Sequence, residues 1–245
     1  MSVSDKLTYL ANTKSAIKSA IEGKGVIVPS NTSFREYADY ISDISGGGYK
    51  CVDVSDDNSY HAEGLSIQHT FTVKTKGIYL AFGGGCSGNH SITSTGTTVS
   101  TKNFNGTDSG HTRNIEVRLF NCNVGDTITL DISADTNSTS AGIYLIAGCN
   151  NATFVDSSFT VDNTSTLAIE RNTPLLFLAY DIGLQGHRSN TINSLSGNVI
   201  TDCVKSRGVG NDDYLIVVSN SASDISLSAY GWSHGASLVI CYELS

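Results

Sequence analysis

Residues 78–82 read Ile-Tyr-Leu-Ala-Phe and residues 176–180 read Leu-Phe-Leu-Ala-Tyr, and these two apolar runs decide the fold class. Similar runs lie at residues 143–147, 214–218 and 238–241. A short continuous apolar run that is flanked by Gly, Asn and Ser is typical of a strand with both faces buried. We therefore expect a core of stacked β-sheets.

The segments next to these runs alternate between apolar and polar residues. The alternation covers residues 65–73, 115–120, 127–132 and 224–229. A period of two residues is typical of strands with one buried face, and clusters of Gly, Asn, Asp and Ser separate the segments as turns do. The sequence predicts a mainly β protein, in which residues 51–245 form an antiparallel β-sandwich or jelly-roll region.

Several segments recur about 95 to 100 residues apart, which indicates an internal repeat. Residues 78–82 match 176–180, residues 119–130 match 216–227, and residues 143–146 match 238–241. Two arrangements fit this pattern. One has two similar β-sandwich units, at 51–150 and 151–245, and the other has one pseudo-twofold β-sandwich domain over 51–245.

Residues 1–45 are expected to form an α-helical hairpin. No Gly or Pro interrupts residues 4–22, and four apolar residues share one helix face: Leu7, Leu10, Ile17 and Ile21. A second helix is predicted to begin at Ser33, because Ser33 and Glu36 have the spacing of a capping box. Three glycines within residues 46–50 predict a linker. About 45 residues bury little surface, so we expect the hairpin to dock on a partner.

The charge of the chain excludes some partners. The 15 Lys and Arg residues against 23 Asp and Glu residues give a net charge of −8, and the acidic excess lies beyond residue 50. An acidic chain without a basic stripe does not neutralise phosphates, so no nucleic-acid partner is expected. No apolar run approaches the ~18 residues of a membrane helix, so no membrane insertion is expected.

No cofactor or metal is predicted. The six cysteines and six histidines lack the close spacing of a metal site, and most of the cysteines are expected to be buried free thiols. The acidic cluster from Asp53 to Asn58 lacks the spacing of a Ca²⁺ loop. No G-x-S-x-G elbow is present, and Glu is scarce beyond residue 50. We expect that the protein is not an enzyme.

Four aromatic and imidazole side chains lie at or beyond strand ends in Gly- and Ser-rich surroundings: Tyr180, His187, Trp232 and His234. Aromatic rings with polar neighbours bind sugars through apolar stacking and hydrogen bonds to hydroxyls. We interpret these residues as a candidate glycan or receptor-binding face. The alternative is that they belong to the core.

The N-terminal segment carries a more specific pattern: Leu7-Thr-Tyr-Leu10, Thr13-Lys-Ser-Ala-Ile-Lys18 and Phe34-Arg-Glu-Tyr-Ala38. Over about residues 5–45 it resembles the N-terminal segment of many bacteriophage virion structural proteins of the tail, baseplate and fibre type. In that family the helical segment precedes varied β-rich domains. The resemblance implies an attachment or assembly segment that contacts other virion proteins. Carried over by position, its residues would be Tyr9, Thr13, Lys14, Ile17, Lys18, Phe34, Arg35, Tyr37 and Ile41.

The resemblance implies a structural protein of the virion, assembled in the host cytoplasm. Its expected role is a tail, baseplate or head-fibre appendage, held at its N-terminus, whose β domains adhere to the host surface, including glycans. A homotrimer is the expected assembly. The main alternative is a capsid decoration or tail adaptor protein without receptor contact, and a lesser alternative is a glycan-degrading enzyme.

Overall fold

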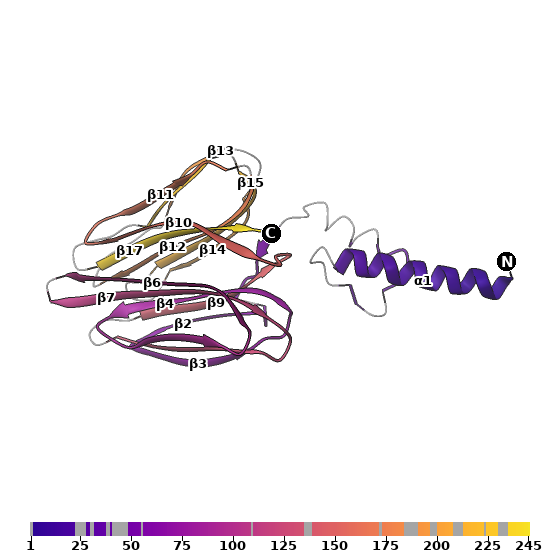
Figure 1. The fold of residues 1–245 in the computed structure, drawn as a ribbon, viewed down its shortest axis with the longest axis horizontal. Helices are drawn as coiled ribbons and strands as arrows, with labels where there is room; N and C mark the ends of the chain where they lie inside the picture. Colours follow the sequence, from indigo (N-terminus) through magenta and orange to yellow (C-terminus); the bar gives the residue numbers. More distant parts are fainter. Residues whose placement is uncertain are drawn as a thin grey trace.

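The computed structural model describes residues 2–22, 28–29, 32–37, 40, 49–54, 56–108, 110–134, 139–171, 173–183, 191–196, 200–207, 213–222, 224–229 and 235–245. The first element is the helix α1 (Val3–Glu22), and the strands β1 to β17 follow it. Figure 1 shows α1 beside a stacked body of β-sheets rather than within it. The described chain is therefore mainly β with an N-terminal helix, as the sequence predicts.

Ser2 is the N-cap of α1 and forms a capping box with Asp5. The backbone N–H of Ser2 donates to the Asp5 carboxylate at 2.7 Å, and the N–H of Asp5 donates to the Ser2 hydroxyl at 3.1 Å. The two bonds satisfy donors that have no partner within the helix. They also lower the pKa of the Asp5 carboxyl.

The second predicted helix is described only in part. Residues 34–36 form a turn, and Tyr37 and Tyr40 have helical geometry. The backbone N–H of Ser33 donates to the Glu36 carboxylate at 2.6 Å, which is one of the two bonds of the expected capping box. The 46–50 linker lies outside the described residues, except for its last two positions.

The described strands form four antiparallel sheets, which we call inner and outer. The first inner sheet has the order β1-β9-β4-β7-β6, and β2 also pairs with β9. Its strands are β1 (Lys50–Cys51), β2 (Ser59–Gly64), β9 (Thr139–Ala147), β4 (Gly77–Cys86), β7 (His111–Cys122) and β6 (Thr97–Asp108). The first outer sheet has the order β3-β8-β5, with β3 (Ser66–Thr72), β8 (Thr127–Ser133) and β5 (His90–Ser94).

The second half of the chain forms the other two sheets. The second inner sheet has the order β10-β17-β12-β15-β14, with β10 (Ala152–Val161), β17 (Gly235–Leu244), β12 (Thr173–Gly183), β15 (Asp213–Ala222) and β14 (Ile200–Arg207). The second outer sheet has the order β11-β16-β13, with β11 (Ser165–Ile169), β16 (Asp224–Ala229) and β13 (Thr191–Ser196).

The four sheets stack as outer, inner, inner, outer (Figure 1). In β4, Tyr79 and Ala81 pack toward the first outer sheet, whereas Ile78, Leu80 and Phe82 pack toward the second inner sheet. In β12, Leu175 and Phe177 likewise face the second outer sheet. Both apolar runs are thus buried on both faces, as their composition predicts. The largest cluster of buried side chains lies between the inner sheets and is shared by both halves of the chain.

Strand registers test the residue matches between the recurring segments. Leu80 is opposite Leu119, and its match Leu178 is opposite Ile216, so these pairs agree with the sequence. On the other side, Ile78 is opposite Ile146, whereas Leu176 is opposite Tyr242. Residues 146 and 242 thus lie opposite the matched residues 78 and 176, one position away from the sequence match of 146 with 241. A continuous apolar run has no period of two that could fix the register.

Among the described residues, no helix combines the length and the apolar content needed to cross a bilayer.

Candidate functional site

The N-terminal half of α1 carries solvent-exposed apolar side chains. Val3, Leu7, Tyr9 and Leu10 are 76%, 62%, 67% and 55% exposed. The C-terminal half differs, because Ile21 is buried in a small cluster with Val28 and Tyr37, and Ile17 and Tyr40 pack against that cluster. The helix therefore has a covered end and an uncovered end.

The predicted attachment residues divide between these two ends. Tyr9, Phe34 and Arg35 are exposed, so they are available to a partner. Tyr37 is buried, and the Lys14 ammonium lies 5.7 Å from the centre of its ring. These contacts hold the parts of the hairpin together, so Lys14 and Tyr37 pack within the hairpin itself.

The remaining attachment residues are half-buried or lie outside the described chain. The Thr13 hydroxyl donates to the Tyr9 carbonyl at 2.9 Å, and the Lys18 ammonium lies 3.6 Å from the Glu22 carboxylate. Both contacts run along the surface of α1. Ile41 lies outside the described residues.

The expectation that Tyr180 belongs to an exposed glycan-binding face is wrong. Its side chain is fully buried between the inner sheets, 5.3 Å from the Phe82 ring, centre to centre. Its hydroxyl donates to the Ser140 carbonyl at 2.8 Å and accepts from the Ser140 hydroxyl at 3.0 Å. Tyr180 has the inward position of a period-two strand, so the core takes it. His187, Trp232 and His234 lie outside the described residues.

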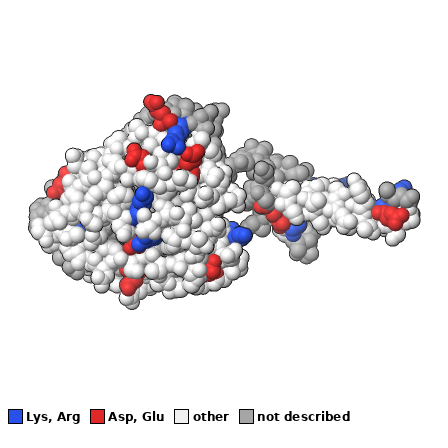
Figure 2. Space-filling view, in the orientation of Figure 1, with Lys and Arg blue, Asp and Glu red and all other residues white. Residues whose placement is uncertain are grey.

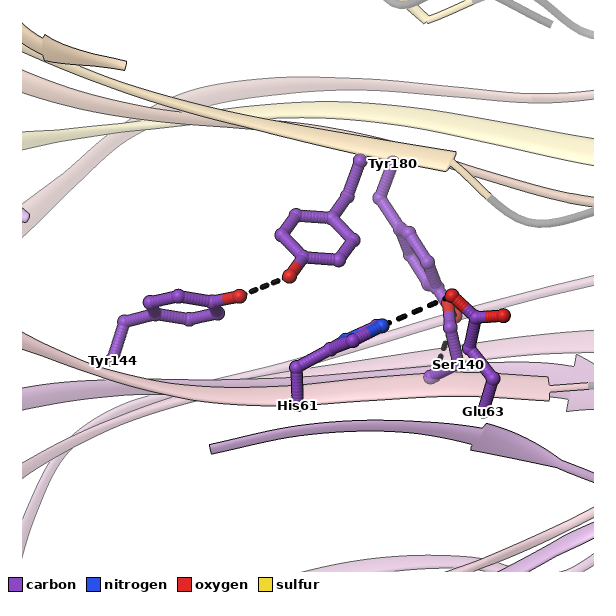
Figure 3. A network of polar contacts seen from close by, with 6 residues as sticks. His61, Glu63, Ser140, Tyr144 and Tyr180 are labelled. Atoms are coloured by element: carbon purple, nitrogen blue, oxygen red, sulfur yellow. Dashed lines mark hydrogen bonds and ion pairs between the residues drawn. The ribbon is translucent and has the colours of Figure 1, made fainter. Parts of the chain in front are cut away.

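Tyr180 belongs to a polar network within the core (Figure 3). The Tyr144 and Tyr214 hydroxyls are hydrogen bonded to each other across the inner sheets, and burial raises the pKa of Tyr144. The His61 ring lies 5.2 Å from that of Tyr214, and its Nε2 lies 3.0 Å from Glu63 Oε1. The three tyrosine side chains are fully buried, so they support the fold and offer no access to a ligand.

The acidic cluster after β1 forms a turn. The Asp56 carboxylate accepts bonds from the Asn58 backbone at 2.9 Å and from its side chain at 2.6 Å, and Asp57 pairs with Lys74 at 2.8 Å. In the part of the chain that the structure describes, no three His, Cys, Asp or Glu side chains gather as a metal site would require.

A groove beside the edge of the first outer sheet is a candidate site. Its cavity has a volume of about 240 Å³. Strand β5 and the turn before it form one wall, and the adjacent ribbon of β6 and β7 forms the floor. We call it the amide groove, and it is lined by Gly88, Asn89, His90, Asn103, Phe104, Asn105, Asn114, Ile115 and Glu116.

The strand period puts the polar lining residues on one face. Asn103 is opposite Glu116, and Asn105 is opposite Asn114, so the four side chains form two neighbouring cross-strand pairs. Phe104 alternates with them and packs into the core between the inner sheets. The floor of the groove is therefore lined by amide side chains, while the apolar side chains of the same strands point the other way and pack into the core.

Glu116 joins the floor of the groove to its wall. The carboxylate is only 5% exposed, and its Oε1 accepts the backbone N–H of Ile92 at 3.2 Å. The same oxygen accepts the Arg118 Nε–H at 2.5 Å and lies 2.5 Å from a second guanidinium nitrogen. The Arg118 charge compensates the buried carboxylate, as a charge at this depth requires.

His90 lies in the wall of the groove. Its Nε2 is buried, and no described residue forms a hydrogen bond with it. Burial lowers the pKa of the ring, while a hydrogen bond with the Gly88 backbone partly opposes that shift.

The sequence analysis missed the amide groove. The available signal was the spacing of Asn103 and Asn105 in one strand and Asn114 and Glu116 in the next, each separated by two positions. That spacing puts each pair on one strand face. The register that brings the pairs together, and the edge strand that walls them, come only from the structure.

Comparison with family models, with curated proteins and with solved structures finds no match to this chain.

Proposed function

We propose that this chain is a bacteriophage virion structural protein that is held in the particle by residues 1–45 and displays its β region for adhesion to the host surface. One observation carries the proposal. The helix with the phage-like sequence pattern lies outside the β body and leaves Leu7 and Leu10 more than half exposed. Exposed apolar stripes of this kind are typical of surfaces that another chain covers.

The stripe on α1 has the spacing of a coiled-coil seam. Its positions alternate in steps of four and three residues: Val3, Leu7, Leu10, Lys14, Ile17 and Ile21. The C-terminal part of the seam is occupied by the hairpin itself, because Ile21 is buried and Lys14 lies over Tyr37. Two uncovered turns are too short for a stable coiled coil alone. We therefore propose a homotrimer whose contacts through α1 are completed by another virion protein.

We also propose that residues 51–245 contain two related jelly-roll units that share one core. In the first half, β2 pairs with β9, β3 with β8 and β4 with β7, as in a long hairpin folded back on itself. In the second half, β10 pairs with β17, β11 with β16 and β12 with β15. The same nested order in both halves supports an internal duplication.

Incorporation into particles tests the attachment role. In the phage whose genome encodes the chain, we expect gradient-purified virions to contain the protein. The variant Leu7→Asp/Leu10→Asp should lower its content at least tenfold, because two carboxylates would enter an apolar contact. The matched control Asn12→Asp/Ser19→Asp adds the same charge on the opposite, exposed face of α1 and should be incorporated normally. Purified virions that lack the wild-type chain would overturn the proposal.

Binding of the purified chain to host cells tests the adhesion role. We expect binding that saturates and that competes with infection by the phage. A chain that enters virions normally but binds no host cells would instead be a capsid decoration or tail adaptor protein, the role that needs no receptor contact.

A further inference from the structure

We propose that the amide groove binds an uncharged saccharide. This inference deepens the adhesion role proposed above, because it names the chemical class of the ligand and the residues that contact it. The groove lies on the β body, at the edge of the first outer sheet.

Unused hydrogen-bonding capacity is the first argument. In the described chain, no hydrogen bond involves the side-chain amides of Asn103, Asn105 or Asn114, although these residues line one cavity. Each amide offers two donors and an acceptor. A sugar hydroxyl is likewise donor and acceptor at once, so a row of amides matches a row of hydroxyls. The lining residue His90 adds a buried Nε2 that has no hydrogen-bond partner among the described residues.

The charge balance of the groove selects against ionic ligands. Glu116 is the carboxylate of the lining, and the Arg118 guanidinium neutralises it through two contacts of 2.5 Å. Lys102 lies between Thr101 and Asn103 on β6, but its ammonium points away from the groove and lies 3.4 Å from the centre of the Phe154 ring. Among the described lining residues there is no Lys or Arg that could pair with a phosphate, sulfate or uronate, and an uncharged ligand needs no such partner.

The groove is also unsuited to an extended peptide. A peptide that adds a strand to a sheet edge needs the unpaired backbone groups of that edge. Here the outward N–H of Ile92 in the edge strand β5 already donates to Glu116 at 3.2 Å. The carboxylate occupies the position in which the carbonyl of an added strand would lie. The contacts of Glu116 with Ile92 and Arg118 use Oε1, which leaves Oε2 to accept a sugar hydroxyl.

The size of the cavity fits a small ring. Its volume of about 240 Å³ is below the ~300–1,000 Å³ of sites for drug-sized ligands. We therefore infer that the groove holds one terminal or branching sugar unit of a longer glycan, with the rest of the glycan outside.

The test uses the purified full-length chain and saturation-transfer NMR. The neutral probes are oligosaccharides built from glucose, galactose, mannose, rhamnose or N-acetylglucosamine, and the charged probes are oligogalacturonate and a glycerol-phosphate polymer. We expect at least one neutral probe to bind and both charged probes to fail. The variant Asn103→Ala/Asn105→Ala should weaken that binding at least tenfold. Both side chains are exposed in the free protein, so the fold should tolerate their loss.

The control is Thr101→Ala, which shortens an exposed side chain on the same face of β6 outside the groove and should leave binding unchanged. Asn114→Ser provides a second groove variant with the same expected loss if the double variant unfolds. Three results would overturn the inference: no neutral probe binds, binding survives both groove variants, or only a charged probe or a peptide binds. This assay needs no particle, so its failure is distinguishable from absence of the chain from virions.

Discussion

The hydroxyl groups of Tyr144 on β9 and Tyr214 on β15 are hydrogen bonded to each other across the two inner sheets, and both residues are at most 1% exposed. The pair connects the first half of the chain to the second in the middle of an apolar core. Each hydroxyl satisfies the other, so neither is left without a partner when the sheets exclude water. The two halves are therefore joined by a matched polar pair as well as by apolar packing.

A double-mutant cycle on this pair should show strong coupling. We expect Tyr144→Phe or Tyr214→Phe alone to lower the free energy of unfolding by about 1–3 kcal/mol, because the remaining hydroxyl loses its buried partner. The double variant should cost less than the sum of the two single variants, since no unsatisfied group remains. Urea unfolding at pH 7 measures all four proteins. Strictly additive costs would contradict the contact.

The helical hairpin should be able to unfold while the β body stays folded. Ile21 is 2% exposed and packs with Val28 and Tyr37, so Ile21→Ala removes the centre of a very small core. We expect most of the helical circular dichroism signal to be lost, because a short helix is marginal without tertiary packing, while the main thermal transition stays within about 2 °C. Leu7→Ala is the matched control, since Leu7 is 62% exposed. A large shift of the main transition in Ile21→Ala would show that the hairpin supports the β body.

Acid should destabilise the chain through two half-buried imidazoles. Burial lowers the pKa of His69, which stacks on Tyr60 at 3.7 Å between ring centres, and it lowers the pKa of His90. The unfolded chain, with histidine pKa values near ~6.5, therefore takes up protons first as the pH falls. The stability they contribute is present above about pH 6.5 and is lost as the pH falls through the folded pKa values.

Urea midpoints measured between pH 7.5 and pH 5 test this expectation. The slope should reach at most about 1.4 kcal/mol per pH unit for each proton taken up. His69→Phe should flatten the profile, and His111→Gln, which changes an exposed residue, should not. A profile of His69→Phe that follows the wild type would rule out His69 as a source of the slope.

The described cysteines should be inert in the native protein. Five of them are buried thiols: Cys51, Cys86, Cys122, Cys149 and Cys241. This confirms for these five the expectation of buried thiols, and burial raises the pKa of Cys149 to about 11. The variant Cys203→Ser leaves only these five thiols. We expect none of them to react with a chromogenic disulfide reagent at pH 8 in the native protein, and all five to react in guanidinium. Rapid reaction of any of the five in the native state would contradict their burial.

Gly88, in the turn that walls the amide groove, should not tolerate a side chain. A Cβ at this position would lie 1.8 Å from the backbone oxygen of Ser133, so the turn or strand β8 must move. We expect Gly88→Ala to cost about 1–3 kcal/mol of stability. Gly110→Ala is the comparison, because a Cβ there meets nothing within 4 Å, although its positive φ of 88° adds strain of its own. Equal stability of Gly88→Ala and wild type would contradict the close contact.

The fold class could be predicted because the signal is local. The run at residues 78–82 has apolar residues at every position, and only a strand with two buried faces needs that. The alternation at residues 127–132 likewise predicts the half-buried strand β8, whose Ile128, Leu130 and Ile132 point inward. These patterns depend on which face each residue occupies and not on which strand lies next to it.

Long-range pairing could not be predicted in the same way. Tyr180 reads as a strand-end aromatic residue in the sequence, and only the packing of β12 against the first inner sheet shows that it is buried. The amide groove has the same difficulty, because Asn105 and Asn114 meet through the register of β6 and β7. Glu116 lies within the alternating segment 115–120, and its role depends on a bond to Ile92 in another sheet.

The nested pairing of strands also sets the order of events during synthesis. Ser59 of β2 pairs with Tyr144 of β9, and Ala152 of β10 pairs with Leu244 of β17. At ribosomal speeds of about 5–20 residues per second, β2 waits at least several seconds for its partner, and the second inner sheet cannot close until β17 leaves the ribosome. During that time the apolar run of β12 has no cover from β17. Chaperones that hold nascent chains should therefore raise the yield of the folded β region. The helix α1 should form without them, because its hydrogen bonds join residues only a few positions apart.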